Sequence, residues 1–324
     1  MIAPRQPHAV SLRISVTDRC PLHCLYCRPP AGVRAAPRRA VLRFDEIVEF
    51  VGLVRSRWHV SKVHLTGGEP LVRRGVVELV ARLAGLDIAD LALTTNGQRL
   101  AGMAADLRGA GLRRVNVSLD SLDPGTYRGL SRGLHLERTL AGIDAARRSG
   151  LAPVKLNMVV LRGINDHEVG RIARFGLQRG CEVRFLEVMP IGAAAARHGE
   201  WFVPSEEVRE RLAAVFRLEP LPAEDSASSR TFRAADGAGR AGLIGFISPC
   251  SRPFCSGCRR LRLTATGRLL GCLAQADGID VRPFLRRRRP RDRQPLLAAV
   301  REALRVKRRE RRFADQQPMI CIGG

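Results

Sequence analysis

Three cysteines near the start of the chain, Cys20, Cys24 and Cys27, stand at the spacing CxxxCxxC. Three thiolates in such a loop can hold a 4Fe-4S cluster and leave one iron without a protein ligand, where chemistry can take place. A structural zinc site normally closes with four protein ligands, and no fourth Cys or His completes this set in the zinc pattern, although His23 lies inside the loop. Cysteines that only pack have no reason to recur at ligand spacing. The loop therefore predicts an iron-sulfur site with an open iron.

A second set of three cysteines, Cys255, Cys258 and Cys272, lies near the end of the chain and again has no obvious fourth ligand. A zinc ribbon that lacks one ligand is the alternative, because CxxC pairs are common in zinc knuckles. Two clusters, each with an open iron, account better for both sets. One open iron can then start the chemistry, and the other can hold a heteroatom of the substrate and orient it. The remaining cysteines are Cys181, Cys250 and Cys321, and no role is predicted for them.

The chain has 324 residues, enough for one large α/β domain with a smaller appendage. The first ten residues, MIAPRQPHAV, lack the charged-then-apolar order of a secretion signal, and no apolar stretch is long enough to cross a bilayer. We therefore expect a cytoplasmic protein with no membrane partner. In a reducing compartment, its nine cysteines favour metal ligation over disulfides.

The net charge of +24 comes almost entirely from arginine, since Lys62, Lys155 and Lys307 are the only lysines. A basic chain can attract nucleic acid, acidic membranes or phosphorylated substrates. Much of the charge lies in two runs near the carboxyl end, RPFLRRRRPRDRQ and RVKRRERRF, which read as solvated segments. Aromatic residues that could stack on bases make up only 5% of the chain and are not interleaved with the charge. We therefore disfavour nucleic-acid binding as the main function, and a zinc-containing nucleic-acid-binding protein is the alternative from another class.

Extended apolar segments alternate with helical patterns along the first two thirds of the chain. The expected strands are residues 11–18, 62–68, 91–97, 114–120, 154–160 and 182–190, and the expected helices are residues 43–56, 76–85, 98–111, 136–150, 166–180 and 205–216. Six strand-plus-helix units in series predict an α/β fold with a parallel sheet, curved into a partial (β/α)6 TIM-like barrel. Residues 220–242 are rich in Pro, Ser, Ala and Gly and read as a connection out of the barrel. We expect the barrel in residues 1–220 and a C-terminal region with the second cysteine set in residues 221–324.

In such a barrel the active face lies where the strands end. Glycine and polar residues stand at these ends, namely the first cysteine loop, Gly67-Gly68-Glu69-Pro70, Thr94-Thr95-Asn96-Gly97 and Ser118-Leu119-Asp120. Since the carboxyl ends of parallel strands meet at one edge of the sheet, these segments predict a single site.

The segments that carry this chemistry resemble one family of enzymes. They are RISVTDRC with HCLYC, LTGGEPL, TTNG, SLDSLD, KLNMVVLRGIND, RFLEVMP, FCSGCRRLRLT and the terminal IGG, and together they look like the GTP 3',8-cyclase family of radical S-adenosylmethionine (SAM) enzymes over residues 11–324. The resemblance implies the radical SAM barrel, with SAM chelated to the open iron of a 4Fe-4S cluster on the first cysteine set. It also implies a second 4Fe-4S cluster on the second set, whose open iron contacts the guanine.

The resemblance also implies roles for individual residues. SAM would be held by Tyr26, Gly68, Ser118 and Met189. GTP would meet Arg13, Thr94, Lys155, Arg260 and Arg262, with Lys62 and Arg184 as weaker candidates for the triphosphate. The candidate catalytic residues are Arg260, Arg262, Gly323 and Gly324, the glycines because a tail without side chains can enter a crowded cavity.

Some residues depart from the family pattern. His64 stands where the family usually has an arginine that is thought to touch the substrate, so that contact is lost, replaced by imidazole or dependent on pH. Arg259 and Cys250 also differ from the residues that are common there, and the arginine-rich residues 286–293 fit the pattern poorly. None of these departures is a cluster ligand.

The activity that the resemblance implies is conversion of GTP to (8S)-3',8-cyclo-7,8-dihydroguanosine 5'-triphosphate, the first step of molybdenum cofactor biosynthesis. One electron enters the first cluster, SAM is cleaved to methionine and a 5'-deoxyadenosyl radical, and this radical removes hydrogen from the 3'-carbon of the ribose. The implied partners are GTP, an unidentified electron donor and cyclic pyranopterin monophosphate synthase as the downstream enzyme, and a homodimer is left open. A peptide-modifying radical SAM enzyme is the nearest rival, but nothing in the chain resembles a peptide-recruiting domain.

Overall fold

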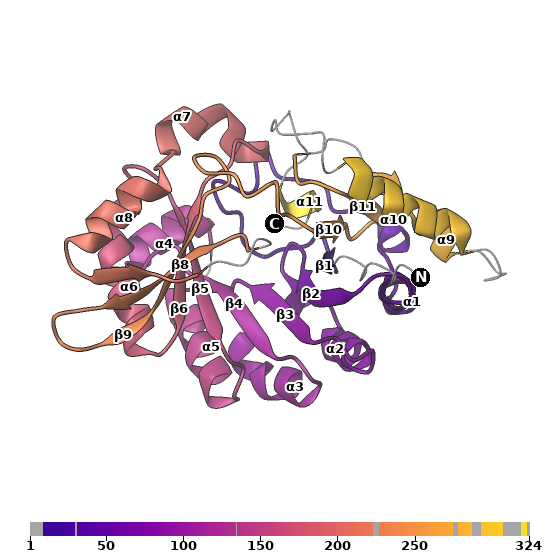
Figure 1. Cartoon of the computed structure of the whole chain (residues 1–324), viewed down its shortest axis with the longest axis horizontal. Helices are drawn as coiled ribbons and strands as arrows, with labels where there is room; N and C mark the ends of the chain where they lie inside the picture. Colours follow the sequence, from indigo (N-terminus) through magenta and orange to yellow (C-terminus); the bar gives the residue numbers. More distant parts are fainter. Residues whose placement is uncertain are drawn as a thin grey trace, which may run out of the picture.

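The structure is a computed structural model, and it describes residues 9–29, 31–133, 135–222, 227–274, 278–286, 293–306 and 319–322. Strands β1 to β6 pair in parallel with their neighbours in chain order. They are β1 (Val10–Ser15), β2 (Val60–Thr66), β3 (Asp90–Thr95), β4 (Arg114–Ser118), β5 (Val154–Val160) and β6 (Glu182–Glu187). The predicted parallel α/β sheet is confirmed, and Figure 1 shows its strands set in an open arc.

Helices follow the strands and cover the outer side of the arc (Figure 1). The α-helices are α1 (Phe44–Arg55), α2 (Val76–Ala84), α3 (Ala104–Gly109), α4 (Pro124–Ser131), α5 (Leu136–Arg148), α6 (Val169–Gln178), α7 (His198–Trp201) and α8 (Ser205–Ala213). Short 3-10 helices are η1 (Arg38–Ala40), η2 (Pro70–Val72), η3 (Leu100–Gly102), η4 (Asp166–Glu168) and η5 (Gly192–Arg197). The single helix predicted over residues 98–111 is divided into η3 and α3, because the backbone leaves the helical region at Met103, where φ is −129°.

The C-terminal part of the chain adds strands to both edges of this sheet. On one edge, β10 (Arg260–Leu263) pairs in parallel with β1 and is followed by β11 (Arg268–Leu270) and β12 (Ile279–Asp280). On the other edge, β9 (Ala241–Ile247) pairs in parallel with β6 and is followed by β8 (Arg230–Ala235) and β7 (Arg217–Pro220). One continuous sheet therefore contains strands from both predicted regions.

Residues 220–242, which the composition indicated as a plain connection, contain strand β8. Phe232 and Ala234 are buried, while Arg233 between them is exposed, so the segment has the alternation of a strand with one face in solvent. Gly237 and Gly239 belong to the turn before β9, where Gly239 has a φ of +76°. The turn-like composition of residues 220–242 therefore gave no indication of this strand.

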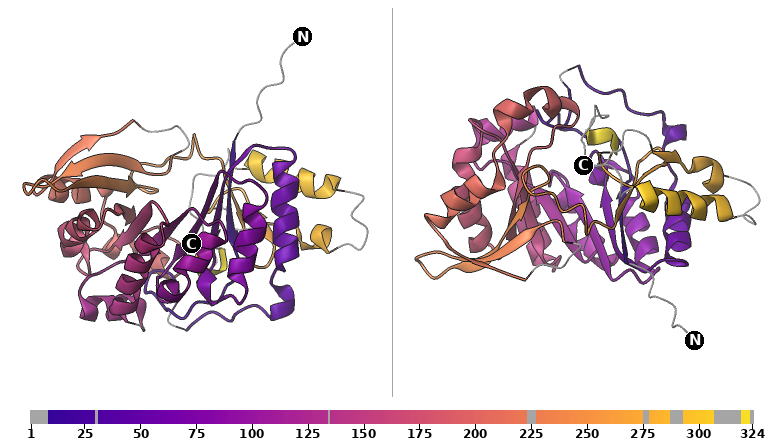
Figure 2. Two further views of the ribbon diagram at one scale, coloured as in Figure 1. Left: turned by 90° about the horizontal axis from the view of Figure 1, so that it is seen from below. Right: turned by 45° about the horizontal axis from the view of Figure 1, so that its top comes forward.

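Helices α9 (Arg282–Leu285) and α10 (Gln294–Val306) pack beside α1, which lies far away in sequence (Figure 2). Arg286, directly after α9, donates from Nε to Oε1 of Glu46 in α1 at 2.7 Å and from Nη1 to the carbonyl oxygen of Arg39 at 3.0 Å. Although burial raises it, the hydrogen bond from Arg286 brings the pKa of Glu46 below its ordinary value. Arg286, although exposed, is therefore a structural partner of a buried carboxylate, while residues 287–292 of its arginine run lie outside the described residues.

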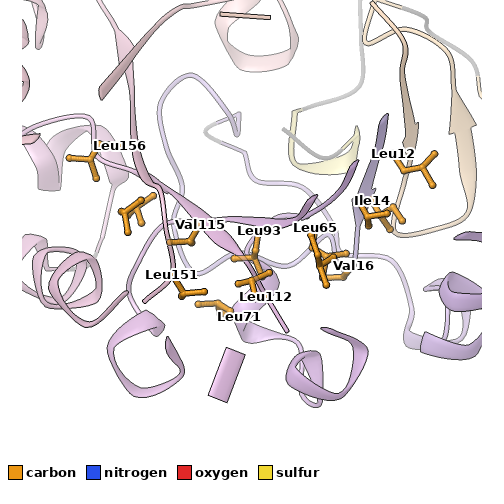
Figure 3. Close-up of a cluster of buried hydrophobic side chains, with 14 of the residues drawn as sticks. Leu12, Ile14, Val16, Leu65, Leu71, Leu93, Leu112, Val115, Leu151 and Leu156 are labelled. Atoms are coloured by element: carbon orange, nitrogen blue, oxygen red, sulfur yellow. The ribbon is translucent and has the colours of Figure 1, made fainter. Parts of the chain in front are cut away.

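The core lies between the sheet and the outer helices. Leu12, Ile14, Leu65, Leu93 and Val115 are among its fully buried side chains, and they point to the same side of the strands in Figure 3. Side chains alternate between the two faces of a strand, so the residues between these face the inner side of the arc. Helix α11 (Met319–Ile322) lies on that inner side, where Ile322 packs with Ile191 and Leu270.

Replacing glycine with alanine should have opposite effects on stability at two positions in α6. A Cβ on Gly176 would lie 2.1 Å from Cγ2 of Val183 in β6, so Gly176→Ala should overpack the core and lower the free energy of unfolding by about 1–3 kcal/mol. A Cβ on Gly170 would have its nearest contact at 3.9 Å, so Gly170→Ala should raise it by about 0.5–1 kcal/mol. Urea unfolding of the two variants measures both effects, and equal stability would contradict the close packing of α6 on β6.

Candidate functional site

The candidate residues in the described part of the chain come together around one cavity of about 830 Å³. Both cysteine sets contribute to its wall, with the ends of β2, β3 and β4 and side chains from β1, β5, β6 and β10. The candidates on the wall are Arg13, Cys20, Cys24, Tyr26, Cys27, Lys62, His64, Gly68, Thr94, Ser118, Lys155, Arg184, Met189, Cys255, Cys258, Arg260, Arg262 and Cys272. Gly323 and Gly324 lie outside the described residues.

The first cysteine set lies in the loop after β1. Burial raises the pKa of the Cys24 thiol well above its ordinary value, and the neighbouring Cys27, Asp120 and Cys20 raise it further. Burial likewise raises the pKa of Cys20 to about 11. The three cysteines are thus near one another on the cavity wall, and the thiols of Cys20 and Cys24 keep their protons until a metal displaces them. This donor set fits an iron-sulfur cluster with three cysteine ligands.

The glycines at the end of β2 touch the backbone that leads into this loop. A Cβ on Gly67 would lie 2.5 Å from the carbonyl oxygen of Thr17, and a Cβ on Gly68 would lie 2.4 Å from that of Arg19. No side chain fits at either position without a shift of the backbone. The Gly68 N–H donates to the Thr17 carbonyl oxygen at 2.6 Å. Gly68, a predicted SAM contact, and its neighbour Gly67 therefore also fix the distance between β2 and the cysteine loop.

Glu69, the next residue, joins the ends of β2 and β3. Its Oε1 accepts from the Thr95 hydroxyl at 2.7 Å and from the Leu71 N–H at 3.0 Å, and its Oε2 accepts from the Asn96 N–H at 2.7 Å. Burial raises the pKa of Glu69 to about 7, while these donors oppose the rise. The carboxylate is thus a structural anchor for two of the predicted strand-end motifs.

Tyr26 in the cysteine loop is fixed by Asp120 at the end of β4. The Tyr26 hydroxyl donates to Oδ2 of Asp120 at 2.6 Å, and Oδ1 of the same carboxylate accepts from the Val159 N–H at 2.8 Å. Burial raises the pKa of Asp120 to about 6. This chain of contacts connects the cysteine loop to β4 and β5, which holds the Tyr26 ring in place on the cavity wall.

The second cysteine set lies around strands β10 and β11. The Cys258 N–H donates to the Cys255 carbonyl oxygen at 3.2 Å, and the Cys272 sulfur accepts from the Ala274 N–H at 3.4 Å. Cys258 and Cys272 both face the guanidinium of Arg262. Three cysteines on one cavity wall, two of them beside the guanidinium of Arg262, fit a second cluster as the family resemblance implies.

Glu187, at the end of β6, holds the segment that leads to this second set. Its Oε1 accepts from the Ser205 N–H at 2.9 Å and from the Ser251 hydroxyl, and its Oε2 accepts from the N–H groups of Cys250 and Ser251, both at 3.0 Å. The side chain is 4% exposed. One buried carboxylate therefore ties β6, the start of α8 and residues 250–251 together.

A row of basic side chains crosses the floor of the cavity. Arg13 in β1 is paired with Arg262 in β10 on one side and with His64 in β2 on the other. Burial and the neighbouring Arg260 lower the pKa of Arg13 to about 9, and burial, Arg13 and Arg260 lower that of Arg262. Positive charges that depress one another's pKa values in this way favour an anionic ligand.

His64 is neutral within this row. Its Nε2 lies 2.6 Å from the Thr94 hydroxyl. Burial lowers the pKa of His64 well below 6.5, and the charges of Arg13, Arg114, Lys62 and Arg260 lower it further. Imidazole therefore contributes a hydrogen-bonding group at this position, where a guanidinium would contribute charge.

Two carboxylates hold the remaining basic candidates. Asp90 accepts two hydrogen bonds from Arg114, each of 2.8 Å, and lies 3.2 Å from Nζ of Lys62. Glu182 lies 2.6 Å from Nζ of Lys155 and 2.6 Å from Nε of Arg184. These ion pairs direct the long side chains along the cavity wall and limit their freedom before any ligand binds.

Five further residues at the site have no role predicted from the sequence, namely Glu69, Asn96, Arg114, Asp120 and Glu187. Four of them stand inside the strand-end motifs, so their position at strand ends was the available signal. Arg114 could have been found from the alternation in β4, where Asn116 and Ser118 also line the cavity. Their hydrogen-bond partners come from other strands, which no local pattern identifies.

Comparison with known proteins places the chain in a class. Residues 14–176 match the Radical SAM superfamily, and residues 181–313 match the family Molybdenum Cofactor Synthesis C. Among solved structures, Streptococcus suis SuiB bound to S-adenosylmethionine superposes with a TM-score of 0.59 at 16% identity, over 83% of this chain and 61% of SuiB. The chain thus spans about three fifths of SuiB, and the two share the fold. This is a radical SAM protein, with the 4Fe-4S cluster and SAM that define the class.

Curated relatives identify the family within this class of proteins. The GTP 3',8-cyclase of Geobacter sulfurreducens is 44% identical over 279 residues, which is 85% of this chain and 83% of the relative. That of Moorella thermoacetica is 42% identical over 319 residues, 97% of each chain. The chain belongs to the GTP 3',8-cyclase family. Membership favours an enzyme over the zinc-containing nucleic-acid-binding alternative. No helix in the described segments has both the length and the apolar character needed to span a membrane.

Removing the charge of Glu187 should affect the second cysteine set alone. In Glu187→Gln the side-chain amide faces the N–H donors of Cys250 and Ser251, and an unsatisfied buried donor costs about 1–3 kcal/mol. We expect the iron content of the reconstituted protein to fall from about eight toward about four irons per chain, since the first cysteine loop is held elsewhere. Glu206→Gln, which removes an exposed pairing with Arg209 on α8, is the control and should keep all its iron. Full iron content in Glu187→Gln would refute this anchoring role.

Proposed function

We propose that the protein converts GTP to (8S)-3',8-cyclo-7,8-dihydroguanosine 5'-triphosphate, the first step of molybdenum cofactor biosynthesis. The observation that carries the proposal is the cavity, which is lined by two sets of three cysteines and by the row of Arg262, Arg13 and His64. A nucleoside triphosphate needs both a large cavity and concentrated positive charge. The wall supplies basic side chains from β10, β1, β2, β4, β5 and β6.

The first cysteine set would hold the cluster that binds SAM. Tyr26, Gly68, Ser118 and Met189 lie on the same cavity wall and are the proposed contacts of SAM. When bound, the cluster and SAM supply one-electron cleavage chemistry that no side chain can perform. The protein's own part is to hold the reacting groups in register and to exclude water, with Tyr26 fixed by Asp120 and the cysteine loop fixed by the β2 glycines.

The second cysteine set and the basic row would hold GTP. We assign the triphosphate to Arg13, Lys155 and the less buried Lys62 and Arg184, and Thr94 to a polar contact beside His64. Arg260 and Arg262 stand next to the second cysteine set and would position the nucleotide there. Gly323 and Gly324 are proposed to enter the same cavity, since α11, which directly precedes them, contributes Met319 to its wall.

The partners other than GTP are also proposals. They are an electron donor for the first cluster, cyclic pyranopterin monophosphate synthase as the enzyme that takes the product, and a homodimer. We further propose a cytoplasmic location, where thiols stay reduced and can receive clusters.

Loss of one cysteine from each set should separate two activities. Cys24→Ala should abolish reductive SAM cleavage, because two thiolates do not hold a defined cluster. Cys258→Ala should still cleave SAM but should not cyclise GTP, because only the second set is incomplete. Anaerobic incubation with SAM, dithionite and GTP, followed by chromatography of methionine and cyclised nucleotide, measures both reactions. Normal cyclisation by Cys258→Ala would rule out a substrate role for the second cluster.

Replacing His64 with arginine should lower the stability of the ligand-free protein and raise its affinity for GTP. A further guanidinium next to Arg13 and Arg114 adds repulsion in the ligand-free protein, so His64→Arg should melt at a lower temperature. The triphosphate offsets that repulsion, so GTP should raise the melting temperature more than in the wild type, with a gain in affinity of about 1.5–3 kcal/mol for a charge-assisted bond. His64→Gln, a neutral control, should show the wild-type response. A smaller response in His64→Arg would mean that the pocket is built around imidazole.

A further inference from the structure

Asn96 directs its side chain toward a cysteine of the first set. Its Nδ2 lies 3.9 Å from the sulfur of Cys20, within the range for a hydrogen bond to sulfur. The side chain is 7% exposed, so solvent offers little alternative for this amide. The backbone N–H of Leu22 donates to the same sulfur. Cys20 thus has two N–H donors, one from its own loop and one from the end of β3.

The orientation of the Asn96 amide is determined by its neighbours. Its Oδ1 accepts from the Gln98 N–H at 3.0 Å, so the oxygen faces Gln98 and the nitrogen faces Cys20. The Asn96 N–H is fixed on Glu69 at 2.7 Å, and its carbonyl oxygen accepts from the Thr139 hydroxyl at 2.9 Å. With both backbone groups and the side-chain oxygen held, the N–H bonds of Nδ2 can reach few atoms other than the sulfur. The contact is therefore built into the fold before a cluster is present.

A donor to a cluster thiolate acts on the electronics of the cluster. Hydrogen bonds to the sulfurs are one of the means by which a protein sets the reduction potential of an iron-sulfur cluster. An N–H group draws electron density from the thiolate, and this stabilises the more negative, reduced state. The carboxylate of Glu69 opposes this effect, because it places negative charge near the same cysteine.

We propose that Asn96 is a positioning residue that raises the reduction potential of the cluster held by Cys20, Cys24 and Cys27, through its hydrogen bond to the Cys20 sulfur. The proposal rests on the assignment of a 4Fe-4S cluster to these cysteines and concerns only the ease with which that cluster accepts its electron. The residue would act on the electron-transfer step and have no contact with GTP. The motif TTNG would thereby link the end of β3 to the cluster as well as to the substrate.

The test compares reduction of the first cluster in three full-length, anaerobically reconstituted variants. Asn96→Leu removes the donor with little change in size, and Asn96→Asp keeps the oxygen that Gln98 needs but loses the amide N–H groups. Gln98→Leu is the matched control, because it removes the side-chain bonds to Thr139 and His135 but leaves the backbone N–H that orients Asn96. The probe is a redox titration followed by electron paramagnetic resonance, restricted to the signal that changes on addition of SAM. Iron content is measured separately, so a missing cluster is distinguished from a shifted potential.

We expect both Asn96 variants to retain iron and to have a more negative midpoint, while Gln98→Leu keeps the wild-type value. At a fixed solution potential the ratio of reduced to oxidised cluster should fall roughly threefold to tenfold, the net effect of one hydrogen bond. A tenfold change corresponds to about 59 mV for a one-electron couple. Wild-type midpoints in iron-replete Asn96→Leu would overturn the proposal, as would an equal shift in Gln98→Leu. Loss of the cluster from both Asn96 variants would overturn it too, since the role would then be structural support of the loop.

Discussion

The two-faced character of the parallel strands is the constraint on which the rest of the molecule depends. In β5, Val154, Leu156, Met158 and Val160 are buried, while Lys155 and Asn157 between them line the cavity. Because strands in a sheet lie about 4.8 Å apart, polar residues at matching positions of neighbouring strands, such as Arg262, Arg13 and His64, form an ordered row of ligands on a curved floor. The apolar face secures the register of that row, since a slip of one residue would send the charges into the core. Binding chemistry and core packing are thus specified by the same alternation.

Concentrated positive charge on the cavity floor opposes folding, and the electrostatic environment of this charge differs between the two ends of the cavity. Asp90 and Glu182 pair with the lysines and arginines toward β3 and β6, while toward β1 and β10 the neighbouring arginines lower the pKa values of Arg13 and Arg262, and His64 remains neutral. Desolvated like charges are costly, so an anion bound at this end of the cavity would offset part of that cost. Binding of the anionic substrate and the stability of the protein are therefore linked.

The sequence predicted the parts of this architecture that have local signals. Period-two and helical patterns located the six strand-helix units, and the cysteine spacings located both sets of thiols. It did not predict that β10 lies against β1, that β8 forms within a turn-rich segment, or that Arg286 pairs with Glu46, because each of these depends on residues distant in the chain. The anchors Glu69, Asp120 and Glu187 were overlooked for the same reason. From the sequence alone, a carboxylate at a strand end could be a catalytic group or an exposed surface residue. Only its hydrogen-bond partners show that it holds two loops together.

The pairing of β10 with β1 has a consequence for biogenesis. Ser11 in β1 pairs on that side with Arg260 in β10, which follows it much later in the chain. At about 5–20 residues per second, the ribosome needs on the order of 10–50 seconds to make the chain between them. During this interval the backbone groups along one side of β1 have no strand to pair with, and such an edge readily joins another chain. The nascent protein therefore passes through a period in which β1 is vulnerable to aggregation. A chaperone that binds β1 would protect it most before the second set of cysteines has been synthesised.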